Sequence, residues 1–189
     1  MGVHKASPLL WKQNTTNPLQ PGGTYGVDVS CMLYGILSSQ EIYRNLSRDP
    51  VASVKHLTAS WLDDWYKVHR FEQLGTKFVF VFDGHELGLK VQRRELRREQ
   101  ARRWRAVAAG AQTWQDYDKA MSKLARVNGH LIRAFCDWVR FKLPRTNYCL
   151  FGAPFEADTQ LVYFERLGLT DGTWHAECRH RYFLLRREP

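Results

Sequence analysis

Long apolar runs, paired cysteines and repeats are all missing from this chain of 189 residues. No stretch approaches the ~18 to 20 apolar residues that cross a bilayer, and no apolar segment follows a basic start as in a secretory leader. The four cysteines form no Cys-x-x-Cys pair, so neither a disulfide framework nor a cysteine-rich metal site is predicted. These absences predict a soluble protein of a reducing, intracellular compartment, without a membrane partner.

Basic residues are present in excess and are concentrated in one segment. The chain holds 28 Lys and Arg against 19 Asp and Glu, a net charge of +9. Between Lys90 and Arg105 eight basic residues face two acidic ones, which gives this segment a net charge of +6. Such a segment favours a polyanionic partner, nucleic acid ahead of an acidic membrane surface, over the alternative of a solvated helix face.

Apolar patterns predict alternating strands and helices around one core. With 44% hydrophobic and 25% charged residues, the composition is typical of a globular domain. Runs without helical spacing predict strands at 25–29, 77–82 and 147–151. Spacings of three and four residues, with their start and stop signals, predict helices at 32–46, 50–74, 90–109, 113–127, 128–143 and 154–167. Strands separated by helical crossovers predict a parallel sheet.

Local signals add detail to three of these helices. In the second helix, one apolar stripe is predicted to be buried: Val54, Leu57, Trp61, Trp65 and Val68. Thr113 and Asp116 have the spacing of a capping box. Pro154 stands where the last helix is predicted to begin, because proline suits the first helical position.

Acidic residues follow three predicted strands. Asp28 ends the first, Asp83 follows the second, and Glu156 and Asp158 come just after the third. Since ligands of open parallel sheets bind beyond the carboxyl ends of the strands, these acids are predicted to meet at one edge. Mg²⁺, a hard cation with oxygen ligands, would relieve their mutual repulsion. Singly, each acid also suits a turn or the first turn of a helix.

Three short segments carry these acids and the start of the basic stretch. They are Gly26-Val-Asp-Val-Ser30, Val81-Phe-Asp-Gly84 before the Arg-rich stretch, and Ala153-Pro-Phe-Glu-Ala-Asp-Thr-Gln160. In order and spacing they resemble the XPG/flap endonuclease family of structure-specific 5′ nucleases, over roughly Gly2 to Gly168. The resemblance implies an α/β, PIN-like or resolvase-like three-layer fold with a mainly parallel sheet and a basic helical arch.

The resemblance also implies roles for individual residues. Catalytic Mg²⁺, two ions in a complete family site, would be bound by Asp28, Asp83, Glu156 and Asp158. The scissile phosphate would be engaged by Lys90 and Arg97, which stand seven and fourteen residues after Asp83. Contacts to the DNA backbone would come from the other arginines: Arg93, Arg94, Arg98, Arg102, Arg103 and Arg105. Trp104 or Trp114 offers a face for an unpaired base, against the alternative of core packing.

By resemblance the chain divides into three regions within one structural domain. Residues 1–110 correspond to the N-terminal nuclease region with the start of the arch, and 111–168 to the rest of the arch and the internal region. Residues 169–189 form a divergent tail. No further strand and no Asp-x-Asp pair are recognised in this tail before the apolar run 182–185. A truncated or divergent chain, with an exposed sheet edge and an incomplete second metal position, is therefore expected.

The function implied is that of a magnesium-dependent 5′ nuclease in DNA repair or replication, located in the nucleus. Its substrates would be DNA with flaps, nicks or frayed ends. The sequence does not distinguish an endonuclease from an exonuclease. A sliding clamp is a possible partner, although no motif for it is recognised. One alternative is a catalytically silent DNA-binding remnant, and another is an RNA-binding or protein-interaction module using the basic helix alone. The tail also holds His175-x-x-Cys178-x-His180, zinc-compatible residues without a fourth ligand.

Overall fold

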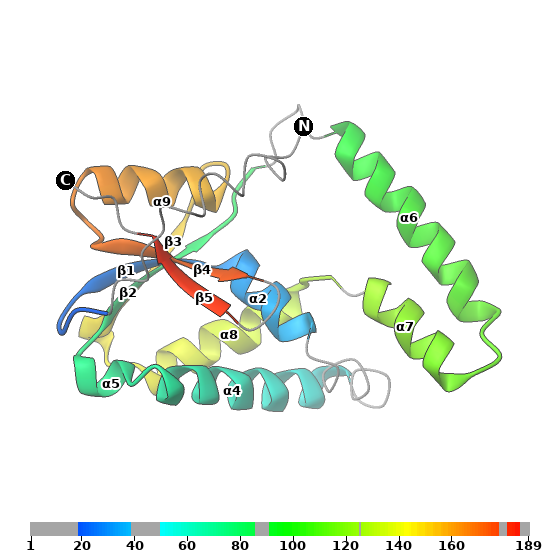
Figure 1. Ribbon diagram of the computed structural model, residues 1–189, viewed down its shortest axis with the longest axis horizontal. Helices are drawn as coiled ribbons and strands as arrows, with labels where there is room; N and C mark the ends of the chain where they lie inside the picture. The colour runs from blue at the N-terminus through cyan, green and yellow to red at the C-terminus, as the bar shows by residue number, and fades with distance from the viewer. Residues whose placement is uncertain (1–18, 39–49, 86–90, 125, 178–180, 186–189) are drawn as a thin grey trace.

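The computed structural model describes residues 19–38, 50–85, 91–124, 126–177 and 181–185. Within them lie five strands, seven α-helices and one 3-10 turn (Figure 1). In chain order these are β1 Thr24–Asp28, α2 Val29–Ser38, α4 Pro50–Val68, α5 Phe71–Leu74, β2 Lys77–Phe82, α6 Val91–Ala109, α7 Trp114–Leu124, α8 Gly129–Lys142, η3 Arg145–Asn147, β3 Tyr148–Gly152, α9 Ala157–Arg166, β4 Gly172–Glu177 and β5 Arg181–Leu185.

The five strands form one mixed sheet of the order β3-β2-β1-β4-β5. The four strands β3, β2, β1 and β4 run parallel, and β5 pairs antiparallel with β4. The predicted α/β class with a mainly parallel sheet is therefore confirmed. Asp28 pairs with Val81, one residue before the end of β2, so the carboxyl ends of β1 and β2 lie side by side at one edge of the sheet.

Helices cover both faces of the sheet, which gives three layers. In Figure 1, α9 lies on one face, and α2, α4, α5 and α8 lie on the other. Successive side chains of a strand point to opposite faces of the sheet. Phe78 and Phe80 therefore belong to the larger core, whereas Val79 and Val81 pack on the side of α9. Gly26 lets α9 approach closely, because a Cβ there would lie 2.5 Å from Leu161 Cδ2.

The second predicted helix is divided in two. Arg70 adopts a left-handed conformation with φ of 54° between α4 and α5. The turn directs Phe71 into the core, while Val68 is left 74% exposed. The prediction that Val68 belongs to the buried stripe is wrong. The spacing assumes one continuous helix, whereas α4 ends at Val68 and Phe71 enters the core from α5 instead. Trp65 is buried, and Leu57 and Trp61 pack partly buried against the core, as predicted.

The first helix begins earlier than predicted. α2 starts at Val29 instead of Met32, because the Asp28 carboxylate caps it: Cys31 N–H donates to Asp28 Oδ1 at 3.0 Å. Residues 39–46 of the predicted helix lie outside the described part of the chain. The capping box before α7 is confirmed, since Asp116 N–H donates to Thr113 Oγ1 at 3.1 Å.

The tail belongs to the sheet. β4 pairs with β1 along Tyr25 to Val27, so the prediction that no further strand precedes the run 182–185 is wrong. Trp174 anchors β4 in the larger core, with its ring centroid 5.5 Å from Phe71 and 6.1 Å from Trp65. The segment Gly-Thr-Trp-His-Ala-Glu alternates small or apolar residues with polar ones, but Trp174 is its single large apolar residue. The local pattern is therefore weak, and pairing with β1 decides the conformation.

Helices α6 and α7 form a hairpin that stands away from the body (Figure 1). The chain leaves the carboxyl end of β2, runs outward along α6, and returns along α7 to α8. The strands β1, β2 and β4 point toward the side on which the hairpin stands. Across the described residues, no helix combines the length and apolar character that crossing a membrane requires.

Candidate active site

Three of the predicted acidic residues gather at the carboxyl edge of the sheet. Asp28 is the last residue of β1, Asp83 directly follows β2, and Asp158 lies in the first turn of α9. Their proximity is electrostatic as well as topological, because the charges of Asp158 and Asp83 both raise the pKa of Asp28. Carboxylates from segments more than 50 residues apart in the sequence thus lie at the same edge of the sheet.

Asp28 is the buried member of this group, with 5% of its surface exposed. Burial, more than any other influence, raises its pKa from the ordinary 3.8 to about 6. Hydrogen bonding from Cys31 lowers the pKa, and the carboxylates of Asp158 and Asp83 add to the increase. A carboxylate held in a dry, negatively charged surrounding is a place where a cation binds favourably.

Asp83 holds the last predicted helix in place. The N–H of Ala157 donates to Asp83 Oδ1 at 2.9 Å, so Asp83 caps α9 from across the sheet edge. Glu156 occupies the N-cap position itself and makes no side-chain cap hydrogen bond. The alternative of a first-turn acid is met by Asp158, which lies in the first turn of α9. Asp83 uses one carboxylate oxygen to cap this helix.

The loops after β2 and β3 are joined through their backbones. Gly84 N–H donates to Phe155 O at 2.5 Å, and His85 N–H donates to Pro154 O at 3.0 Å. Because Pro154 and Phe155 use their carbonyl groups in this way, α9 begins at Ala157 and not at Pro154 as predicted. This backbone clamp fixes where Asp83 stands relative to α9.

Gly84→Ala is expected to open the backbone clamp. A Cβ at Gly84 would overlap the carbonyl oxygen of Ala153 and lie 2.8 Å from Pro154 C and O, and backbone atoms cannot rotate away. We expect a loss of about 1–3 kcal/mol in the free energy of unfolding, measured by urea denaturation. The matched control is Gly152→Ala, where a Cβ meets nothing within 4 Å; equal stability of the two variants would contradict the clamp.

The residues of the acidic group suit Mg²⁺ in chemistry. All are carboxylates, the oxygen ligands that Mg²⁺ accepts, and Mg²⁺ commonly uses one or two carboxylates and keeps several waters. Within the part of the chain that the structure describes, no three His, Cys, Asp or Glu side chains are grouped closely enough to hold an ion between them. These ligands therefore fit an ion that is held by one or two of the carboxylates and by waters. Glu156, which is half-buried and precedes Ala157, is a further carboxylate at the start of α9.

Asp28→Asn is expected to stabilise the metal-free protein at neutral pH. A pKa that rises from 3.8 to about 6 on folding means that the folded state binds the proton more tightly. The free energy of unfolding therefore falls as the pH rises from about 4 to about 6, and it stays low above that range. Two pKa units correspond to ~3 kcal/mol, so the Tm of the variant should exceed the wild-type Tm by several degrees at pH ~7.5 and match it near pH ~4.

Added Mg²⁺ provides the second measurement on this variant. Binding to the folded state alone raises the Tm, so Mg²⁺ should raise the wild-type Tm at pH ~7.5 and should have a smaller effect on Asp28→Asn. A wild-type Tm that is higher than that of the variant at neutral pH without metal would contradict the raised pKa of Asp28.

The basic helix α6 leads directly away from this edge. The five predicted cationic residues whose side chains are described are all exposed: Arg97, Arg98, Arg102, Arg103 and Arg105. Arg103 pairs with Glu99 at 2.6 Å across one turn of the helix, an exposed pair that contributes little to stability. Arg93 and Arg94 lie in the first turn of α6. Lys90 lies outside the described residues, as do Cys178 and His180 of the zinc-compatible set.

Two acids of the tail lie in the part of the chain that the structure describes, and their backbones are at opposite edges of the sheet. Asp171 lies at the amino end of β1, where its Oδ2 accepts from Thr24 N–H at 2.7 Å, so it stands at the edge opposite to Asp28. Glu177 is the last residue of β4, and β4 runs parallel to β1. Its backbone therefore ends at the edge of the acidic group. Sequence reasoning missed Glu177 because no strand was predicted before it.

The tryptophans of the hairpin differ in exposure. Trp114 is largely exposed and stacks on Tyr117, with ring centroids 5.4 Å apart. Trp104 is half-buried between α6 and α7. Neither belongs to the cores of the domain, which leaves the predicted stacking role open.

A scan against protein-family models and a search of curated proteins each found no match to this chain. The interpretation of the acidic group, the backbone clamp and the basic helix therefore depends on the sequence and the structure of this chain.

Proposed function

We propose that this protein is a magnesium-dependent, structure-specific 5′ nuclease of the XPG/flap endonuclease type, which hydrolyses phosphodiester bonds of DNA. One observation carries the proposal: the carboxylates of Asp83 and Asp158 lie near enough to raise the pKa of Asp28 at the sheet edge where β2 ends, and β2 is followed by an arginine-rich hairpin. The strand β2, whose end carries one residue of the acidic group, is thus followed in the chain by the cationic helix α6.

The fold supports the finer expectation of a PIN-like or resolvase-like domain. The parallel strands β3, β2, β1 and β4, with helices on both faces, have the architecture that this proposal requires. The projecting hairpin of α6 and α7 corresponds to the basic helical arch expected from the sequence. The tail adds the strand β4 to this parallel sheet, beside β1.

Each residue of the site has a distinct task in this proposal. When bound, Mg²⁺ would supply Lewis-acid stabilisation of the phosphate and an activated water. Asp28, Asp83, Asp158 and Glu156 would hold the metal and exclude competing anions by their charge. Lys90 and Arg97 would bind the scissile phosphate, where the planar fork of arginine matches two phosphate oxygens. Positive charge at that point stabilises the charge that develops on the phosphate during displacement.

The remaining arginines of α6 would bind the DNA backbone. Arg98, Arg102 and Arg105 are exposed on the outward helix, and contacts of this kind are independent of sequence and weaken with salt. DNA with flaps, nicks or frayed ends is the proposed substrate, and the nucleus the proposed location. Nothing in this assignment requires a sliding clamp.

A catalytically silent DNA-binding protein is the second candidate. It is favoured by one observation: within the described ranges, no three potential ligand side chains converge on one ion position. In this alternative the hairpin binds DNA while the acidic group serves only to cap α2 and α9.

The test is cleavage of an end-labelled 5′-flap duplex by the purified chain in Mg²⁺, with EDTA as the control. A junction-sized product that EDTA abolishes supports the nuclease. Binding of the flap without cleavage supports the silent alternative. Preference for single-stranded RNA over flapped DNA at equal salt contradicts both.

A further inference from the structure

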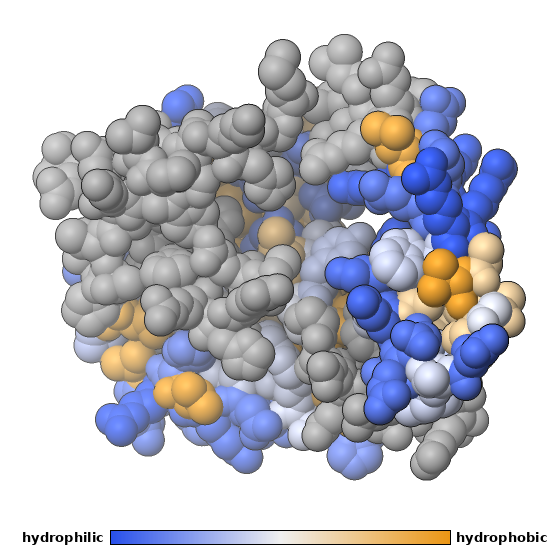
Figure 2. Space-filling model, turned by 45° about the vertical axis from the view of Figure 1, so that its right-hand side comes forward, coloured by the Kyte–Doolittle hydropathy of each residue, from blue (hydrophilic) through white to orange (hydrophobic). Residues whose placement is uncertain are grey.

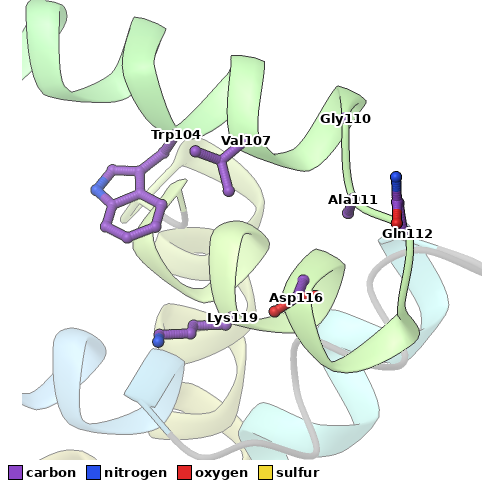
Figure 3. Close-up of a pocket in the computed structure, with 7 residues that line it drawn as sticks. All are labelled: Trp104, Val107, Gly110, Ala111, Gln112, Asp116 and Lys119. Carbon is purple, nitrogen blue, oxygen red and sulfur yellow. The ribbon is translucent and has the colours of Figure 1, made fainter.

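Two hollows adjoin each other between the helices of the hairpin. The first, of about 440 Å³, is lined by Trp104, Val107, Gly110, Ala111, Gln112, Asp116 and Lys119 (Figure 3). The second, of about 460 Å³, is lined by Gln100, Arg103, Trp104, Val107 and Lys123. Trp104 and Val107 line both hollows, and the two hollows together are called here the hairpin groove.

The floor of the hairpin groove is apolar and accessible. Val107 is 47% exposed, and Trp104 is half-buried beside it. Leu96, 60% exposed, precedes Gln100 by four residues, so it lies on the same face of α6 one turn nearer the start of the helix. Large apolar side chains thus follow this face from Leu96 to Val107, about 16 Å or three helical turns.

The hairpin itself leaves this face uncovered. α6 has 19 residues and α7 has 11, so α6 extends about 12 Å beyond its partner. Ala120 is fully buried at the α6–α7 contact, whereas the side chains over the groove meet solvent. In Figure 2 an apolar cluster stands among the hydrophilic side chains of the hairpin.

The rim of the groove is mainly cationic. Lys119 and Lys123 on α7 and Arg103 on α6 line it, against the single carboxylate of Asp116. A partner that fills the groove therefore needs an apolar stripe for the floor and acidic residues beside that stripe. An amphipathic helix carries both at fixed spacing.

We propose that the hairpin groove binds an acidic amphipathic helix of a partner protein, about three to four turns long, as a third helix on α6 and α7. This face of α6 favours such a partner over a nucleic acid, because Leu96 and Val107 are aliphatic and Trp104 is the single aromatic side chain of the helix. Because the floor is distinct from the acidic site, this inference does not depend on the proposed nuclease activity.

The test uses a defined probe with the intact chain. A fluorescein-labelled peptide of about 18 residues, with leucines at helical spacing flanked by glutamates, is titrated with the protein and followed by anisotropy. A peptide of the same composition in scrambled order is expected to bind about tenfold more weakly. Equal affinity for both peptides would mean attraction by charge alone and would overturn the proposal.

Matched substitutions locate the binding surface. Val107→Glu is expected to weaken binding of the amphipathic peptide about tenfold, and Lys123→Glu several-fold. Their controls, Val68→Glu and Lys77→Glu, change exposed residues of the body in the same way and should leave the affinity within about twofold. Far-UV circular dichroism confirms that each variant keeps its helices. Unchanged binding by Val107→Glu would overturn the proposal.

Two other occupants are distinguished by the same variants. An oligothymidylate whose binding falls with Val107→Glu by the same factor as that of the peptide would make the groove a nucleic-acid site. A dimer of this chain that forms in sedimentation, disappears with Val107→Glu and excludes the peptide would make it a self-association surface. Either result would overturn the proposal.

Discussion

Asp83→Asn is expected to lower Mg²⁺-dependent cleavage of a 5′-flap duplex by about 100-fold or more while leaving DNA binding intact. The asparagine side chain can still accept the hydrogen bond from Ala157 N–H, which Asp83 Oδ1 now accepts at 2.9 Å. The charge is lost and the cap on α9 is kept. The measurement is the single-turnover cleavage rate, together with the Tm and the affinity for the flap in EDTA.

Two companion variants separate chemistry from structure. Asp83→Ala removes the cap as well and should lose about 1 kcal/mol more stability than Asp83→Asn. Asp171→Asn makes the same change at the opposite edge of the sheet, where Asp171 accepts from Thr24 N–H, and should cleave at the wild-type rate. If Asp83→Asn cleaves as fast as Asp171→Asn, Asp83 does not act in the site and its role is only to cap α9.

Trp174→Ala is expected to cost about 3–5 kcal/mol of the free energy of unfolding. Trp174 is 4% exposed and packs edge-on against Phe71 and Trp65, with centroids 5.5 and 6.1 Å away. Removing the indole leaves a cavity among large rings that cannot close around it. A fall of the Tm by about 10 °C or more in a thermal melt is the expected result.

Trp114→Ala is the matched control for this change. Trp114 is 58% exposed on the hairpin and stacks only on Tyr117 among the rings described, so its loss should cost about 1 kcal/mol or less. Equal effects of the two substitutions would mean that β4 does not depend on Trp174 for its place in the sheet. Stability would then reside in the rest of the fold.

Local patterns were sufficient to predict the sheet from β1 to β3 and the positions of its acids. The continuous apolar run from Phe78 to Phe82 predicts a strand covered on both faces, and the structure places it between β1 and β3. The residue after it, Asp83, must then stand at the carboxyl edge, because strand ends in a parallel sheet share one side. The meeting of Asp28, Asp83 and Asp158 follows from this topology.

The arginine-rich helix was also determined by the sequence. From Val91 to Ala109 no proline or glycine interrupts the chain, and a stretch so rich in arginine and glutamate, with few large apolar residues, cannot pack into a core. It therefore forms a solvated helix, as α6 does on the projecting hairpin. Its cationic character, which motivates the proposal of a DNA partner, is a property of composition alone.

The tertiary structure alone decided the remaining features. β4 carries only a weak strand pattern, with Trp174 as its single large apolar residue, and is a strand because it pairs with β1 and buries Trp174. Pro154 does not begin α9, because its carbonyl accepts from His85 N–H. The pKa of Asp28 rises because of burial, which residue types do not reveal. In each case the feature depends on contacts with residues that are distant in the sequence, and a local sequence pattern does not reveal such contacts.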